Sequence, residues 1–308
     1  MELPIRMNQP KETSKRSQKK PDWLRINLPK AGEYAYLKEY LNKFNLHTIC
    51  ESGNCPNIGE CWQNRTATFM ILGDICTRSC SFCAVKTGKP LPPDFKEPGR
   101  IATVIKEMRL MHCVITSVDR DDLPDGGAEI WAETIEEIKR INPNTTIEAL
   151  IPDFKGVHEN IHHIIQSKPD ILSHNLETVE RLTKLVRVQA KYKRSLDVLN
   201  FIASNGIAAK SGIMLGLGET KEEVLQTMDD LLDAGCSILT LGQYLQPTKN
   251  HLPVDRYVHP EEFEEMRSNA LQKGFTFAEC GPLVRSSYHA EKHISAHKAD
   301  PKKTKTDF

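Results

Sequence analysis

Three closely spaced cysteines are the residues of this sequence best suited to chemistry. Cys76, Cys80 and Cys83 form the pattern C-x3-C-x2-C. The thiolate is the metal-binding form of cysteine, and three soft ligands at this spacing favour iron and sulfur. A [4Fe–4S] cluster takes one ligand on each iron, so three cysteines leave one iron open to an external ligand. The pattern therefore predicts a reactive cluster rather than an electron store.

A second set of cysteines lies upstream. Cys50, Cys55 and Cys61 form the pattern C-x4-C-x5-C, and the residues between them include Gly, Asn and Pro. These residue types are typical of loops, and loop residues can wrap around a metal. We therefore expect the three thiols to converge from loops on a second metal centre.

The remaining cysteines, Cys113, Cys236 and Cys280, lie in or beside apolar strand-like segments, where we expect buried side chains. The total of nine cysteines is odd, and a chain of 308 residues can form a core without disulfides. We therefore expect a reducing, cytoplasmic location.

Alternating strands and helices must position these cysteines. The predicted strands are residues 66–72, 112–118, 145–151, 170–174, 207–215, 237–241 and 275–278. The predicted helices are residues 100–111, 128–141, 157–167, 177–187, 192–204, a segment that begins after the capping box of Thr220 and Glu223, and residues 260–273. This order is typical of the α/β class, with parallel units closing into a partial or full TIM-like (β/α) barrel.

The pattern divides the chain into four segments. Residues 1–20 are basic and are expected to be a disordered tail, whereas residues 21–65 form an N-terminal extension with the upstream cysteines. Its Trp, Tyr and Leu side chains are expected to pack on the main body. Residues 66–280 form the barrel, and residues 281–308 form a C-terminal extension with a mobile tail.

Composition excludes several partners. The chain has 41 basic and 41 acidic residues, which gives no general reason to expect nucleic acid or an anionic membrane. It contains no run of eighteen apolar residues, and its N-terminus lacks the apolar core of a signal peptide. We expect neither a membrane span nor a secretory signal.

The C-x3-C-x2-C motif resembles that of the radical S-adenosylmethionine (SAM) superfamily. The alternative is a zinc knuckle, but zinc sites usually pair two C-x2-C motifs or add His at fixed spacing, and neither pattern is present. Phe82 occupies the aromatic position of the superfamily signature. The resemblance implies that SAM chelates the open iron and that an electron from the cluster cleaves SAM to a 5′-deoxyadenosyl radical.

The two cysteine motifs together resemble those of the lipoyl synthase family. The segment Arg285-Ser286-Ser287-Tyr288 strengthens this resemblance, although alone it would be typical of a surface turn. The similarity extends from about Asp22 to Ala290. It implies that the upstream cysteines hold an auxiliary [4Fe–4S] cluster with Ser286 as the fourth ligand, or Ser287 as the fallback.

The family implies an activity and partners. Two sulfur atoms would be inserted at C6 and C8 of an octanoyl group on a lysine of a lipoyl carrier domain, with the auxiliary cluster as donor. The carrier would be the glycine-cleavage H protein or the acyltransferase (E2) subunit of a 2-oxoacid dehydrogenase, a ferredoxin or flavodoxin would supply electrons, and the enzyme would be a monomer. The alternatives are another two-cluster radical enzyme that inserts sulfur or dehydrogenates, and a non-enzymatic iron–sulfur or zinc protein.

Polar residues that follow the predicted strands are the candidates for binding SAM. By resemblance, Ser117 and Asp119 would hold the methionine amino end, and Asn175 and Glu177 the ribose hydroxyls. The adenine side would involve Gly216, Gly218, Gln243 and Tyr244. An ordinary strand-to-helix turn explains the two glycines equally well. All of these residues follow strands, so a parallel barrel would bring them to one face.

Overall fold

A curved, mostly parallel sheet forms the centre of the computed structural model, which describes residues 19–25, 39–53, 55, 57, 58, 61, 66–288 and 290. The two expected tails, apart from Lys19 and Lys20, and residues 34–38 of the Tyr34–Phe44 segment lie outside these residues. The sheet order is β1-β2-β5-β6-β7-β8-β9-β10. Its strands are β1 (His47–Thr48), β2 (Thr66–Ile71), β5 (His112–Ser117), β6 (Thr146–Leu150), β7 (Ile171–Ser173), β8 (Ala208–Leu215), β9 (Ile238–Gln243) and β10 (Phe277–Gly281).

The sheet forms a partial barrel. From β2 to β10 every neighbouring pair is parallel, whereas β1 pairs antiparallel with β2. Within the described residues β1 and β10 are the two ends of the sheet and do not pair with each other. The expectation of a parallel α/β barrel is therefore confirmed in its partial form.

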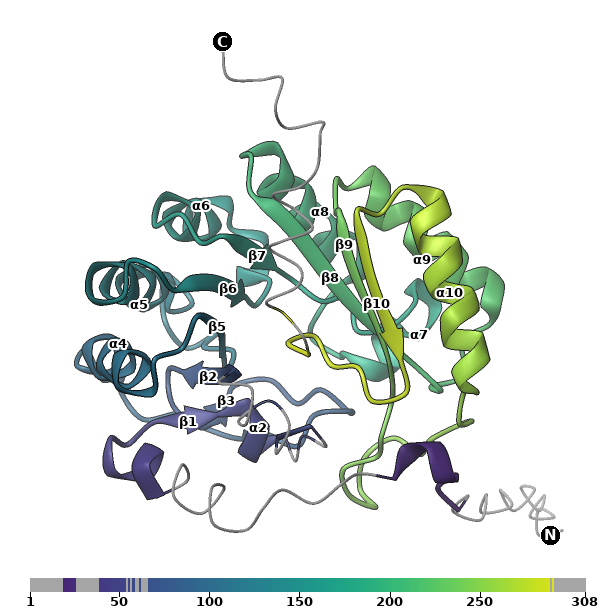
Figure 1. Cartoon of the computed structure of the whole chain (residues 1–308), viewed down its shortest axis with the longest axis horizontal. Helices are drawn as coiled ribbons and strands as arrows, with labels where there is room; N and C mark the ends of the chain where they lie inside the picture. Colours follow the sequence, from purple (N-terminus) through teal and green to yellow (C-terminus); the bar gives the residue numbers. More distant parts are fainter. Residues whose placement is uncertain are drawn as a thin grey trace, which may run out of the picture.

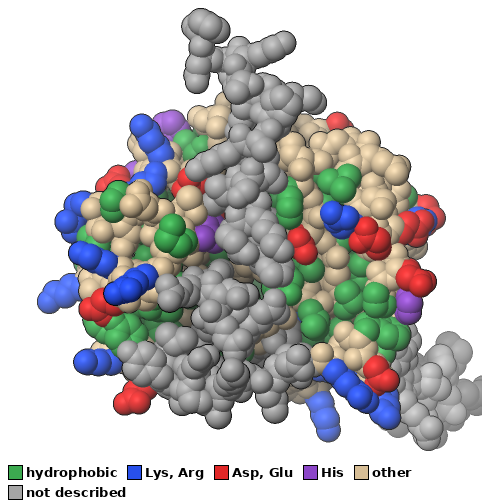
Figure 2. All heavy atoms as spheres, in the orientation of Figure 1, with side chains coloured by type: hydrophobic (Ala, Val, Ile, Leu, Met, Phe, Trp, Pro, Cys, Tyr) green, Lys and Arg blue, Asp and Glu red, His purple; other side chains and the backbone are tan. Residues whose placement is uncertain are grey.

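Helices cover the outside of this sheet, as Figure 1 shows. They are α4 (Glu97–Met108), α5 (Ala128–Ile141), α6 (His158–Gln166), α7 (Glu180–Val186), α8 (Tyr192–Ser204), α9 (Lys221–Asp233) and α10 (Pro260–Lys273). Each long helix buries one apolar stripe; in α5 it includes Trp131, Ile135 and Ile138. Figure 2 shows that most of the charged side chains visible on this face lie toward its left and right edges.

The sequence patterns predict most element bounds well. α5 and α10 have the predicted bounds, and Thr220 and Glu223 form both hydrogen bonds of the capping box at the start of α9. The predicted helix 100–111 is wrong at both ends because α4 begins at Glu97 and Arg109 takes a left-handed conformation with φ of 52°. Met111 is consequently 70% exposed instead of lying on the buried face. The predicted start of the final strand is also wrong, since β10 begins at Phe277, two residues after the predicted start at Phe275.

Two short elements around the cysteines had no sequence signal. A small parallel sheet joins β3 (Ile75–Cys76) to β4 (Lys86–Thr87) and closes the cysteine loop at its base. A four-residue helix, α2 (Ile49–Ser52), follows β1. The described part of the N-terminal extension packs on the main body, since Leu24 of η1 (Asp22–Leu24) is buried and the ring of Trp23 meets that of His259. No helix among the described residues has the length and apolarity required to cross a bilayer.

Candidate active site

A cavity of about 490 Å³ lies at the carboxyl ends of the parallel strands. The three motif cysteines Cys76, Cys80 and Cys83 line it, together with Phe82. The sequence-predicted residues that also line it are Ser117, Asp119, Asn175, Glu177, Gln243, Tyr244 and Ser286. The fold therefore brings together residues from the end of β2 to the segment after β10.

Backbone hydrogen bonds join the cysteine loop to the segment after β5. The amide N–H groups of Arg78 and Asp119 donate to Sγ of Cys76 at 3.4 and 3.3 Å. The carbonyl of Asp119 accepts from the amide and the hydroxyl of Thr77 at 3.0 and 2.9 Å. N–H groups directed at a ligand sulfur are one means by which proteins tune an iron–sulfur cluster.

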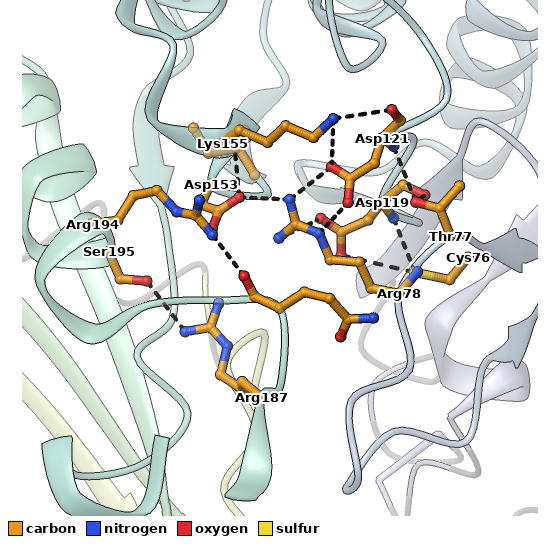
Figure 3. A network of polar contacts seen from close by, with 12 residues as sticks. Cys76, Thr77, Arg78, Asp119, Asp121, Asp153, Lys155, Arg187, Arg194 and Ser195 are labelled. Atoms are coloured by element: carbon orange, nitrogen blue, oxygen red, sulfur yellow. Dashed lines mark hydrogen bonds and ion pairs between the residues drawn. The ribbon is translucent and has the colours of Figure 1, made fainter. Parts of the chain in front are cut away.

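Arg78 fixes the same loop through its side chain (Figure 3). This buried guanidinium contacts Asp121 through Nε at 2.6 Å and Asp153 through Nη2 at 2.8 Å, and Asp119 through Nη1 at 3.2 Å. Arg194 pairs with the other oxygen of Asp153 at 2.8 Å. Burial would raise the pKa of Asp153, but these guanidinium groups hold that pKa at about 2. The loop is thus tied to the ends of β5 and β6.

Two other elements hold the far side of the loop. Ser81 donates through its amide to the carbonyl of Val186 and through its hydroxyl to that of Leu185, at the end of α7. The amide of Leu252 donates to the carbonyl of Ser81 at 3.2 Å, and Nε2 of His251 lies 2.9 Å from the carbonyl of Cys83. The cysteine loop is therefore supported from three directions.

The three free thiols and their spacing fit an iron–sulfur cluster better than a single metal ion. All three are free thiols in this structure. Burial raises the pKa of Cys80 to about 12 and that of Cys83 to about 11, while burial and the carboxylate of Asp119 raise the pKa of Cys76. In the described part of the chain no three His, Cys, Asp or Glu side chains are spaced for a single metal ion. Each cysteine of a [4Fe–4S] cluster binds a different iron, so its ligands lie further apart than around one ion.

Unpaired polar atoms beside the cysteines fit a polar cofactor such as SAM. Oγ of Ser117 and Oδ1 of Asn175 are buried without a hydrogen-bond partner among the described residues. Buried polar groups normally have partners, so such atoms indicate a ligand site. Gly212 keeps the space beside them open, because a Cβ there would lie 3.1 Å from Oδ1 of Asn175 and 2.6 Å from Oγ1 of Thr240. Glu177, two residues after Asn175, has an unusual φ of 64°.

Four predicted cofactor residues serve the fold in ways the sequence did not reveal. Gly216 and Gly218 do not line the cavity; a Cβ on Gly216 would lie 2.2 Å from Nε2 of Gln243. The amide of Gln243 donates to the carbonyls of Leu215, Tyr244 and Arg256 at 3.0–3.1 Å. The hydroxyl of Tyr244 donates to the carbonyl of Leu252. Gln243 and Tyr244 thus line the cavity, but their polar groups already have protein partners.

Cys55 and Asn57 of the upstream cysteine segment lie near the segment that follows β10. The expectation that they belong to loops is wrong for two of them, because Cys50 lies in α2 and Cys61 is helical. The amide of Cys55 donates to the carbonyl of Cys50 at 3.0 Å, and the positive charge of Arg285 acts on the Cys55 thiol. Nδ2 of Asn57 donates to the carbonyl of Leu283 at 2.6 Å. Residues 283–286 therefore connect the N-terminal extension to the cavity.

Comparison with known proteins identifies the family. A model of the radical SAM superfamily matches residues 70–231, and a model of the N-terminal domain of lipoyl synthase of that family matches residues 5–55. The lipoyl synthase of Flavobacterium johnsoniae is 58% identical over 276 residues, which cover 89% of this chain and 96% of that protein. This chain belongs to the lipoyl synthase family.

Other lipoyl synthases are equally similar. That of Phocaeicola vulgatus is 60% identical, covering 90% of this chain and 97% of that protein. The mitochondrial lipoyl synthase of Nematostella vectensis is 58% identical, covering 89% of this chain and 95% of that protein. As a lipoyl synthase, the chain is a sulfur-inserting radical SAM enzyme, which implies SAM, a [4Fe–4S] cluster and lipoyl carrier domains as substrates.

Solved structures resemble the chain in fold. The FeFe-hydrogenase maturase HydG from Carboxydothermus hydrogenoformans superposes with a TM-score of 0.54 at 14% identity, covering 86% of this chain and 78% of HydG. Methylornithine synthase (PylB) superposes with a TM-score of 0.52 at 12% identity, covering 76% of this chain and 82% of PylB. At such identities the likeness concerns the fold alone.

The sequence patterns did not indicate several residues at or near the site of this lipoyl synthase. Arg187 lines the cavity and donates through Nη1 to the carbonyl of Asn175 at 2.8 Å. Glu148 and Lys210 form a fully buried ion pair of 2.7 Å beneath the cavity. A charged residue within an otherwise apolar strand was the available signal for this pair. Arg78 and Asp153 gave no such signal, because their roles depend on tertiary contacts.

Proposed function

We propose that this lipoyl synthase uses two [4Fe–4S] clusters to insert sulfur at C6 and C8 of a carrier-bound octanoyl group. Cys76, Cys80 and Cys83 would hold one cluster, and Cys50, Cys55 and Cys61 with Ser286 the other. The observation that carries the proposal is that Ser286 lines the same cavity as the first cysteine set, while the adjacent Arg285 acts electrostatically on Cys55. The C-terminal segment thereby links the two sets.

The residues around the first cysteine set have separable roles. When bound there, the cluster supplies the electron that cleaves SAM to the 5′-deoxyadenosyl radical. Ser117 and Asn175 orient SAM with their unpaired polar atoms, and Asp119 and Glu177 supply carboxylates beside them. Phe82 provides an apolar wall between the second and third cysteines.

Apolar side chains prepare the cavity for an alkyl substrate. Met70, Ile151 and Met214 line it, from strands β2 and β8 and the end of β6. Such a lining favours the octanoyl chain through the hydrophobic effect and excludes water from a radical that would otherwise react elsewhere. The sulfur itself would come from the auxiliary cluster, which is consumed as a substrate.

A direct test uses anaerobically prepared holoprotein with a reductant, SAM and an octanoyl-lysyl peptide. We expect 5′-deoxyadenosine and a dithiolane-bearing peptide by mass spectrometry, with cluster sulfide lost in step with product. Release of 5′-deoxyadenosine without sulfur in the peptide would reject the substrate but keep radical SAM chemistry. Zinc without acid-labile sulfide in the purified protein would reject both clusters.

A further inference from the structure

A fully buried polar network lies inside the barrel, directly beneath the cavity. Nζ of Lys210 on β8 contacts both carboxylate oxygens of Glu148 on β6, at 2.7 and 2.8 Å. The hydroxyl of Ser173, on the intervening β7, donates to Oε1 of Glu148 at 2.8 Å. Lys210, Glu148 and Ser173 are each 0% exposed.

The register of the sheet explains why these side chains meet. Ser173 and Lys210 are Cα partners on neighbouring parallel strands, and side chains two residues apart on a strand share a face. Ala208, Lys210, Gly212 and Met214 of β8 therefore point into the barrel in succession. Gly212 and Met214 line the cavity. Lys210 consequently lies one layer below the cavity floor.

A third hydrogen bond joins Lys210 to a residue outside the sheet. Nζ also donates to the main-chain carbonyl of Ser286 at 2.5 Å. An ammonium group has three N–H donors, and Glu148 and Ser286 together supply three acceptor oxygens. Because Lys210 binds the carbonyl, this contact does not use the hydroxyl of Ser286.

The C-terminal segment is also fitted against β9. Gly242 has no side chain, and a Cβ there would lie 2.1 Å from the carbonyl oxygen of Val284. The amide of Val284 donates a hydrogen bond to the carbonyl of Gly281 at 3.1 Å. The segment thus enters the barrel closely packed, and Lys210 reaches it from below.

We propose that Lys210, held by Glu148 and Ser173, is a positioning residue that fixes the C-terminal segment so that the Ser286 hydroxyl faces the auxiliary-cluster site. A buried ion pair is a weak source of stability, because desolvation of both charges offsets their attraction. Its presence is better explained by the position that it imposes on Ser286. This inference rests on the proposed role of Ser286 as a cluster ligand.

The test compares hydrogen exchange of the peptide spanning residues 282–288 in the holoprotein. Lys210→Met combined with Glu148→Gln removes the bond to Ser286 without leaving a buried charge. We expect amide exchange in this peptide to become about tenfold faster, and iron and sulfide content to fall from two clusters toward one. Tyr192→Phe is the matched control, because it removes a different hydrogen bond, to Asp230, and should change neither readout.

Each result has a defined meaning. Unchanged exchange in the folded double variant would overturn the proposal. If that variant does not fold, Ser173→Ala is measured instead; it should make exchange about threefold faster, and unchanged exchange would again overturn the proposal. Ser286→Ala separates the two ideas: loss of one cluster with normal exchange supports its ligand role, whereas full cluster content rejects that role without affecting the exchange result for Lys210.

Discussion

Nη2 of Arg78 lies 2.8 Å from Oδ1 of Asp153, so the loop that carries the three motif cysteines is tied to the end of β6. Arg78→Met would leave Asp119, Asp121 and Asp153 without this shared cation. We expect the free energy of unfolding to fall by about 3–5 kcal/mol, as for a buried pair that loses one partner. We also expect the iron bound by the first cysteine set to fall, which chemical denaturation and iron analysis would measure.

Arg100→Met is a matched control for this change. Arg100 pairs with Asp94 near the surface at 2.8 Å, and such pairs contribute less than about 1 kcal/mol. Equal effects of the two substitutions on iron content would contradict a positioning role for Arg78.

Gly242→Ala tests the close approach of the C-terminal segment to β9. The new Cβ would lie 2.1 Å from the carbonyl oxygen of Val284, and backbone cannot yield as a flexible side chain does. We expect a loss of about 1–3 kcal/mol in unfolding free energy and faster proteolysis after residue 281. Gly99→Ala is the control, because the new Cβ would meet no packed neighbour within 4 Å. Within the helix, alanine is favoured over glycine by about 0.5–1 kcal/mol. Identical proteolysis of both variants would exclude the packing explanation.

Periodic patterns predicted the frame of the molecule but not the support of its site. The bounds of α5 and α10 follow from apolar spacing and end signals, which are local properties of the sequence. The strand order follows from the handedness of parallel connections. The cluster site could be predicted because the spacing of Cys76, Cys80 and Cys83 indicates metal binding by itself, without any tertiary contact.

Contacts with a partner far away in the sequence could not be predicted. Gln243 follows a strand and lines the cavity, but nothing in the sequence indicates that its side-chain amide donates to the backbone carbonyls of Leu215 and Arg256. Arg78 lies between two cysteines, but Asp153 meets it only after two strand-to-helix units have folded. Such contacts carry no periodic signal, so sequence patterns could not reveal them.

Glu97 should give the stability a specific pH dependence. Burial raises the pKa of Glu97 from 4.5 to about 7, while its carboxylate accepts a hydrogen bond from the amide of Leu72 at 2.8 Å. Between these pH values the unfolded chain has lost the proton that the folded chain keeps, so stability falls as pH rises, by about 3 kcal/mol in total. Above pH 7 this contribution stays constant.

Glu97→Gln keeps an acceptor for Leu72 but cannot ionise, so the difference in unfolding free energy between the two proteins should change across this window. The two proteins must be compared because His174 adds a pH dependence of its own. Burial lowers the pKa of His174 to about 4, which makes the unfolding free energy rise with pH in an overlapping range. A difference that stays constant from pH 4.5 to 7 would contradict the raised pKa of Glu97.

Ser286→Cys tests why the auxiliary cluster would have an oxygen ligand. An alkoxide is harder than a thiolate and suits iron–sulfur chemistry less well, so the iron that it binds should be the easiest to release. We expect the variant to retain two clusters by iron and sulfide analysis, yet to transfer sulfur about tenfold more slowly in a single turnover, equivalent to about 1.4 kcal/mol in the barrier. Ser287→Cys is the control and should match the parent protein in both measurements. A normal transfer rate in Ser286→Cys, or a slow rate confined to Ser287→Cys, would assign the ligand role away from Ser286.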